Sequence, residues 1–168
     1  MTRSPHRPSG SNSDDRDDRA SLGRLGEDAA ASYLAARGYR IVARNVRADR
    51  VELDLIARFG VALVFVEVKT RRGARHGQAA EAVDRRKQRR LRHGAQAWLA
   101  GHPPEARGAL RHRFDVVTCV LLDTRARAEP TGTTTWPQTW PPKEASPRNE
   151  ASAPEGARWS IEHWQSAF

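Results

Sequence analysis

The chain has 168 residues, with 29 lysines and arginines against 20 aspartates and glutamates, so its formal net charge is +9. Positive charge of this size favours a polyanionic partner such as nucleic acid. The sequence contains no run of about 18 apolar residues that could cross a membrane. The single cysteine, Cys119, excludes a disulfide or a multi-thiolate zinc site within one chain. The N-terminus lacks the apolar region of a secretory signal, so we expect a cytoplasmic protein without membrane contact.

The first half of the chain predicts one helix and three strands. Residues 1–20 are polar, charged and without periodicity, which is typical of a disordered tail. Apolar residues then recur at helical spacing over Ser21–Arg37, and Gly38 is a suitable residue to end that helix. Three runs rich in β-branched residues follow, and they predict strands over Tyr39–Val46, Val51–Arg58 and Val61–Thr70.

The second half predicts a basic loop at Arg71–Gly77, a helix over Gln78–Ala100 and a strand over Arg113–Asp123. Residues 124–157 are rich in Thr, Pro, Ala, Glu and Trp and lack any period, which is typical of a flexible insertion. Residues 158–168 regain apolar character, so we expect them to pack back on the domain. The order helix, three strands, helix, strand over residues 21–123 predicts an α/β domain with a mixed central sheet flanked by helices.

Acidic and basic side chains interrupt the second and third predicted strands. Because side chains alternate across a strand, Glu67 and Lys69 share one face, and Asp54 on the neighbouring strand can reach that face if the register allows. Buried carboxylates are costly unless they are paired or bind a cation. Carboxylate oxygens suit Mg²⁺ or Mn²⁺, which also bind phosphate oxygens. Lys69 would then hold an attacking water or offset negative charge. The alternative is a structural ion pair at a strand end.

Two helical residues could approach the same cluster. Glu27 borders the apolar stripe of the first helix, which makes it a candidate third metal ligand, although a solvated glutamate is the plainer interpretation. Lys87 lies four residues from both Val83 and Leu91, so it faces the sheet rather than solvent. It is one of only three lysines among the 29 basic residues, which favours a specific use of its ammonium group.

Arginines are concentrated on the second helix and directly after Lys69. Dense basic runs of this kind are candidates for binding phosphates, and a solvated helix face is the alternative. The candidate nucleic-acid-binding residues are Arg71, Arg72, Arg85, Arg86, Lys87, Arg89 and Arg90.

Five segments together resemble the YraN family of small bacterial proteins. The segments are GRLGEDAAASYLAARGYRIVARNVR, ELDLIA, LVFVEVKTRR, EAVDRRKQRRL and RFDVV, and the final SAF is also similar. The resemblance covers about residues 22–123 and rests on the order and spacing of these blocks. The family is similar in fold to archaeal Holliday-junction resolvases and to the wider PD-(D/E)XK nuclease-like group. The resemblance therefore implies a restriction-endonuclease-like αβββαβ core.

The resemblance also implies roles for individual residues. By position, Asp54, Glu67 and Lys69 would match the two acids and the lysine of a metal-dependent phosphodiesterase motif. Glu27 would match an acid on the first helix, and Lys87 a basic position on the second. One departure concerns Val51, because the family usually has glycine directly before the Glu-hydrophobic-Asp block.

Three functional hypotheses follow from these observations. The first is a nucleic-acid-binding protein with endonuclease activity that uses Mg²⁺ or Mn²⁺, possible substrates being branched or damaged DNA. The second is a non-catalytic nucleic-acid-binding module that retains the nuclease fold. The third is a protein-interaction factor whose charge is incidental. DNA is preferred to RNA as the partner, and the oligomeric state is left open, with a homodimer as one candidate.

Overall fold

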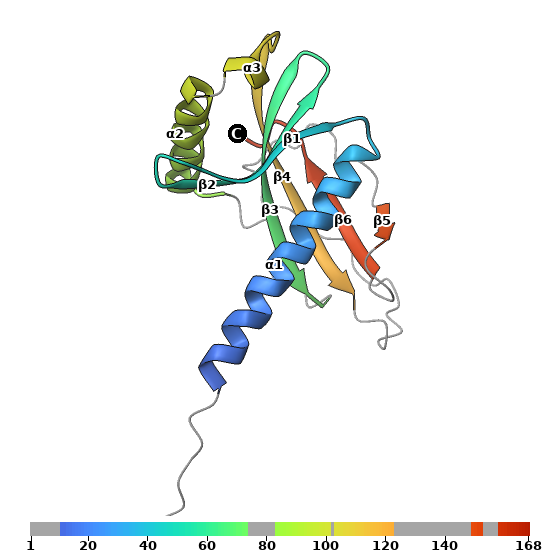
Figure 1. Cartoon of the computed structure of the whole chain (residues 1–168). Coiled ribbons are helices and arrows are strands. Elements are labelled where there is room, and N and C mark those ends of the chain that lie inside the picture. Colours follow the sequence, from blue (N-terminus) through green and yellow to red (C-terminus); the bar gives the residue numbers. More distant parts are fainter. Residues whose placement is uncertain (1–10, 74–82, 102, 123–148, 153–157) are drawn as a thin grey trace, which may run out of the picture.

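The computed structural model describes residues 11–73, 83–101, 103–122, 149–152 and 158–168. Six strands form one sheet in the order β1-β2-β3-β4-β6-β5 (Figure 1). The strands are β1 (Arg40–Ala48), β2 (Val51–Phe59), β3 (Ala62–Arg72), β4 (Arg111–Leu122), β5 (Asn149–Ser152) and β6 (Arg158–Trp164). The helices are α1 (Ser11–Ala35), α2 (Arg85–Gly101) and the short α3 (Pro103–Ala106). None of the helices in this described part is long and apolar enough to span a membrane.

The sheet is mixed, as predicted. β3 pairs antiparallel with β2 and parallel with β4, while the other neighbouring strands pair antiparallel. The parallel β3–β4 pair requires a crossover, which α2 supplies. β3 is the central strand, and its residues from Ala62 to Glu67 are all buried. This burial explains why the run is almost continuously apolar. The order α1-β1-β2-β3-α2-β4 matches the predicted αβββαβ arrangement and is compatible with a restriction-endonuclease-like core.

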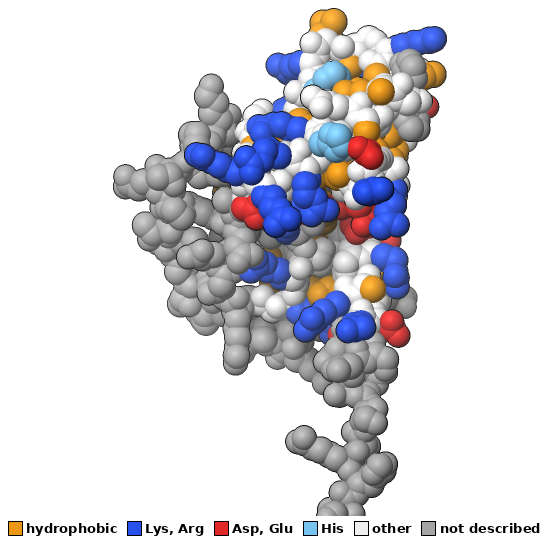
Figure 2. Space-filling model, turned by 90° about the vertical axis from the view of Figure 1, so that its left-hand side faces the viewer, with side chains coloured by type: hydrophobic (Ala, Val, Ile, Leu, Met, Phe, Trp, Pro, Cys, Tyr) orange, Lys and Arg blue, Asp and Glu red, His pale blue; other side chains and the backbone are white. Residues whose placement is uncertain are grey.

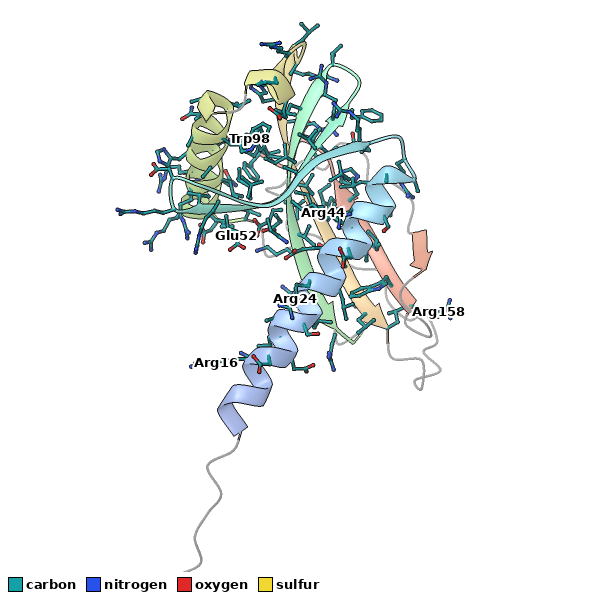
Figure 3. All side chains as sticks on the ribbon, viewed as in Figure 1. Arg16, Arg24, Arg44, Glu52, Trp98 and Arg158 are labelled. Atoms are coloured by element: carbon teal, nitrogen blue, oxygen red, sulfur yellow. The ribbon has the colours of Figure 1, made fainter. Side chains whose placement is uncertain are left out.

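The two long helices pack on separate apolar clusters. The stripe predicted for the first helix, including Tyr33 and Leu34, packs with Leu55, Val64 and Val66 of the sheet. The stripe predicted for the second helix packs with a different set of residues, which includes Leu53, Leu63 and Phe65. Figure 3 shows Trp98 pointing from α2 toward the sheet, where its ring meets Phe65 edge-on. Both helical stripes are therefore confirmed as core.

The helices begin at different residues from those predicted. α1 starts at Ser11 instead of Ser21, so residues 11–20 are helical, while residues 1–10 lie outside the described part. Figure 1 shows the first turns of α1 continuing beyond the sheet, so no apolar stripe was present to reveal them.

α2 starts at Arg85 instead of Gln78, and residues 78–82 lie outside the described part. Asp84 sets the start, because its carboxylate accepts a hydrogen bond of 2.7 Å from the backbone N–H of Lys87. This is N-cap geometry, and the run of helix-forming residues before Asp84 concealed it. β3 in turn extends to Arg72, so Arg71 and Arg72 belong to the strand and not to a basic loop.

The C-terminal segment packs on the domain, as expected. It does so as strand β6, which pairs with β4 over Arg158–Trp164, and the N–H of Ala167 donates to the carbonyl of Phe114. Part of the predicted insertion, Asn149–Ser152, forms edge strand β5. The remainder of residues 124–157 lies outside the described part of the chain.

Candidate active site

The site begins with a bend in β2 at Asp54. Strict alternation would place Leu53 and Leu55 on one face, but Leu53 packs beneath α2 and Leu55 packs beneath α1. The β1–β2 ladder skips the pair that would join Asp54 to Asn45, and Asn45 has a positive φ of 49°. The β2–β3 ladder ends at the Leu55–Val66 pair. β2 and β3 therefore separate at Asp54, where a side chain can enter the space between them.

Asp54 lies directly beyond the last residue pair of this ladder. Its Oδ2 accepts a hydrogen bond of 2.8 Å from the backbone N–H of Val68, which takes the place of a strand-to-strand bond. Burial and the nearby charge of Glu67 raise the pKa of Asp54 to about 7, and the charge of Glu27 adds a smaller rise. The Val68 hydrogen bond and the charge of Lys87 act in the opposite direction. Asp54 and Glu67 thus lie close enough for one carboxylate to disfavour ionisation of the other.

Glu67 is the most enclosed member of the site, with 5% of its side chain exposed. Its Oε1 lies 3.1 Å from Nζ of Lys69 and 3.2 Å from Nζ of Lys87. Its Oε2 is buried without a hydrogen-bond partner among the described residues. The two oxygens of one carboxylate therefore differ sharply, since one is shared by two ammonium groups and the other has no donor in the described part of the chain.

Glu67 lines a small cavity of about 10 Å³, which is room for roughly one water molecule. The other walls of this cavity are mainly apolar and include Leu53, Phe65, Leu91, Phe114 and Phe168. Phe168 stacks on Phe114 at 5.1 Å between ring centres, so the last residues of the chain help to enclose Glu67. An apolar wall beside a carboxylate strengthens its attraction for cations.

Lys69 and Lys87 reach Glu67 from different elements. Lys69 lies two residues along β3 on the same face, and Lys87 comes from the first turn of α2. Their side chains are 35% and 36% exposed, so both ammonium groups connect the buried acid with solvent. The inward orientation of Lys87 agrees with the position predicted from its spacing to Val83 and Leu91.

Glu27 approaches the site from α1. The preceding residue, Gly26, brings the helix close to β3, because a Cβ at that position would lie only 2.0 Å from Oγ1 of Thr70. Glu27 is half-buried and near enough to influence the pKa of Asp54. In the described part of the chain, however, no three Asp, Glu, His or Cys side chains form a group that could hold a metal. Asp54, Glu67 and Glu27 are therefore not a ready-made three-carboxylate site.

The donor set still suits a hard divalent cation. Asp54 and Glu67 offer carboxylate oxygens, and the Oε2 atom of Glu67 lacks any other described partner. Mg²⁺ is commonly held by one or two carboxylates, with water and substrate phosphate completing its coordination. An added positive charge would also relieve the repulsion that raises the pKa of Asp54. The residues present thus fit a cation that shares its ligands with a bound phosphate.

Basic side chains surround the start of α2. Figure 2 shows the face of the molecule that carries α2, where lysines and arginines gather around a few acidic groups. The exposed arginines of this helix are Arg85, Arg86, Arg89, Arg90 and Arg92, and the first four are the candidates predicted from the sequence. Arg72 lies at the end of β3 and is paired with Asp18 of α1 at 2.8 Å, and Arg71 beside it is half-buried. Glu52, labelled in Figure 3, is exposed and takes no part in the buried cluster.

A second polar cluster was not predicted from the sequence. Asp115 is fully buried in β4 and accepts two hydrogen bonds from Arg113, at 2.8 and 2.9 Å. His163 of β6 lies 2.9 Å from the same carboxylate, and the backbone N–H of Ser166 donates to it at 3.0 Å. Arg113 also donates to the hydroxyl of Tyr39. The only signal was a charged pair at alternate positions in the apolar segment RFDVV.

The chain was compared with known proteins by sequence. The pattern of the Uncharacterised protein family UPF0102 matches residues 26–119. A UPF0102 protein of Symbiobacterium thermophilum is 54% identical over 99 residues, which are 57% of this chain and 79% of that protein. A UPF0102 protein of Anaeromyxobacter dehalogenans is 44% identical over 117 residues, which are 68% of this chain and 84% of that protein. The matched region contains Asp54, Glu67, Lys69 and Lys87. The chain therefore belongs to the UPF0102 family, which is the YraN family that its motifs resemble.

Proposed function

We propose that this protein binds nucleic acid, preferably DNA, and hydrolyses phosphodiester bonds with Mg²⁺ or Mn²⁺, in the cytoplasm. The observation that carries the proposal is the convergence of Asp54 and Glu67 at the point where β2 and β3 separate, with Lys69 against Glu67. An acid such as Asp54, whose ionisation is opposed by burial and by the charge of Glu67, is costly to keep, and such groups concentrate at functional sites.

Each site residue has a proposed task. Asp54 and Glu67 would hold the divalent cation, which when bound would polarise the phosphate and acidify a water. Lys69 would position the attacking water or offset charge on the phosphate, since its ammonium group already lies 3.1 Å from Glu67 and reaches solvent. Glu27 would orient water bound near Asp54. Glu27 influences the pKa of Asp54 through its charge.

The arginines of α2 provide the proposed phosphate-binding surface. Arg85, Arg86, Arg89 and Arg90 are exposed and lie on the helix that also sends Lys87 into the site. A nucleic-acid backbone bound to this surface would run past the carboxylates of Asp54 and Glu67. Binding through several phosphates should weaken steeply as salt concentration rises.

The test is cleavage of a panel of branched, nicked, duplex and single-stranded DNA and RNA, with Mg²⁺, with Mn²⁺ and with EDTA. Asp54→Asn, Glu67→Gln and Lys69→Met should each reduce metal-dependent cleavage roughly 100-fold or more. Glu52→Gln is the matched control, because this exposed acid lies on the same strand outside the cluster. Absence of cleavage on every substrate, with no metal bound in calorimetry, would count against the proposal.

A second candidate is a nucleic-acid-binding module without catalysis. It is favoured by the two ammonium groups that already neutralise Glu67, and by the absence of a three-ligand metal group among the described residues. This alternative predicts salt-sensitive binding that persists in Asp54→Asn and falls when Arg85, Arg86, Arg89 and Arg90 are changed to Gln. If no nucleic acid binds even at low salt, a protein-interaction role becomes the better explanation.

A further inference from the structure

Lys87 and Lys69 contact the same oxygen of Glu67, although one carboxylate needs only one counter-charge. The distances to Oε1 are 3.2 Å for Lys87 and 3.1 Å for Lys69. We propose that Lys87 is a resident counter-ion, which keeps a divalent cation out of the site until a nucleic-acid phosphate draws its ammonium group away. This inference rests on the proposed function and concerns the regulation of the same site.

The first step is electrostatic competition at Glu67. A divalent cation held by Glu67 would lie within a few ångströms of both ammonium groups, and like charges at such distances repel strongly in a poorly solvated site. Because only 5% of Glu67 is exposed, water screens this repulsion weakly. At least one ammonium group must therefore withdraw before the cation can bind tightly.

Lys87 is the one free to withdraw. Lys69 lies two residues from Glu67 on the same face of β3, so strand geometry keeps its side chain beside the acid. Lys87 belongs to α2, the helix that carries the arginines of the phosphate-binding surface, and its exposure of 36% is about equal to the 35% of Lys69. A rotation about the side-chain bonds of Lys87 can move the ammonium group outward without any movement of the helix.

Exposed arginines beside Lys87 can bind a phosphate toward which its ammonium group would move. Arg90 lies one turn along α2 beside Lys87, and Arg86 precedes it in the helix, and both are exposed. A phosphate bound by these arginines offers Lys87 an anionic partner that replaces Glu67. Occupation of the basic surface and entry of the cation are thereby linked through one side chain.

This linkage predicts positive cooperativity that is reciprocal. Nucleic acid should strengthen binding of the cation, and the cation should strengthen binding of nucleic acid by the same factor. Removing the Lys87 charge should uncouple the two ligands. The variant would bind the cation well without nucleic acid and gain little when nucleic acid is added.

The experiment measures Mn²⁺ affinity of the full chain by electron paramagnetic resonance, without nucleic acid. Lys87→Met should bind Mn²⁺ roughly tenfold more tightly than wild type. Arg111→Met is the matched control, since it removes one exposed positive charge at the start of β4, outside the phosphate-binding surface, and leaves Glu67 untouched. Mn²⁺ binding that is lost in Asp54→Asn, alone or combined with Lys87→Met, is binding at the site. Lys87→Gln serves as a second variant, and thermal unfolding in EDTA verifies that each protein folds.

A second measurement follows fluorescence anisotropy of a labelled branched DNA that carries phosphorothioate linkages, with Mn²⁺ or with EDTA. Mn²⁺ should raise DNA affinity in wild type and Arg111→Met, but much less in Lys87→Met. Mn²⁺ binding that depends on Asp54 but is unchanged or weakened by Lys87→Met overturns the counter-ion inference alone. Failure of wild type and both Lys87 variants to bind Mn²⁺ overturns the proposed function, and this inference with it.

Discussion

At the scale of single residues, the site places groups where they are unfavourable for folding. Glu67 is buried with one oxygen crowded by two ammonium groups and the other without a described donor. Asp54 retains a proton close to neutral pH because burial and Glu67 oppose its ionisation. Folding alone would favour apolar residues at both positions, because buried ion pairs are rarely more stabilising than well-packed hydrophobic groups.

The Asp54 carboxyl should leave a signature in the pH dependence of stability. Its pKa is about 7 in the folded chain against 3.8 for an ordinary aspartate, so the folded state holds the proton more tightly between these limits. The free energy of unfolding should therefore fall as pH rises from about 4 to about 7. Asp54→Asn should remove at most about 4 kcal/mol of this change. Urea denaturation in EDTA across that pH range is the measurement.

Glu52→Gln provides the control for this prediction, because it removes an exposed acid two residues away on the same strand. Its unfolding curves should keep the wild-type dependence on pH. If Asp54→Asn and Glu52→Gln behave alike, the Asp54 carboxyl is not held in the protonated form described.

At the scale of elements, close helix–sheet contacts bring the site together. A Cβ at Gly94 of α2 would lie 2.7 Å from a methyl carbon of Val51 on β2. A glycine on the helix therefore accommodates valine at the strand position where the family usually has glycine. In α1, Gly26 makes the corresponding approach against Thr70 of β3.

Two glycines in α1 allow a matched test of this packing. Gly26→Ala should destabilise the fold by about 1–3 kcal/mol, because the added carbon overlaps the Thr70 side chain. Gly23→Ala, one turn earlier, meets nothing within 4 Å and should stabilise by about 0.5–1 kcal/mol through helix propensity. Thermal and denaturant unfolding of both variants gives the comparison. Equal effects of the two substitutions would mean that α1 is not closely packed against β3 at Gly26.

At the scale of the whole molecule, the buried cluster around Asp115 joins β4 to β6. Asp115 is fully buried and accepts hydrogen bonds from Arg113 and from the backbone of Ser166, while His163 contacts its second oxygen. The same C-terminal segment carries Phe168, which helps to enclose Glu67. Loss of this anchor should therefore disturb the site as well as the sheet.

Asp115→Ala should reduce stability by about 3–5 kcal/mol, because Arg113, with only 12% of its side chain exposed, would lose its counter-charge. Asp28→Ala is the control, since Asp28 also pairs with an arginine, Arg44, but its side chain is 70% exposed. That exposed pair should contribute at most about 1 kcal/mol. Denaturant unfolding compares the two, and hydrogen exchange should show loss of protection in β6 for Asp115→Ala only. A cost below that of Asp28→Ala would contradict the anchoring role.

Features that depend on local periodicity could be predicted from the amino-acid pattern alone. Apolar spacing identified the stripes of both long helices, and β-branched runs identified β1 to β4. Alternation placed Glu67 and Lys69 on one face, and helical spacing turned Lys87 toward the sheet. Such patterns reflect which side of a helix or strand is buried, so they can be interpreted for each element separately.

The relations between elements became visible in the folded chain and could not be predicted from the pattern. The bend at Asp54 breaks the alternation of β2, and the contact of Lys87 with Glu67 depends on how α2 sits on the sheet. The pairing of Asp115 with His163 joins residues 48 positions apart, and β6 becomes a strand through its ladder with β4. These features arise from register and packing between distant segments, which local spacing does not encode.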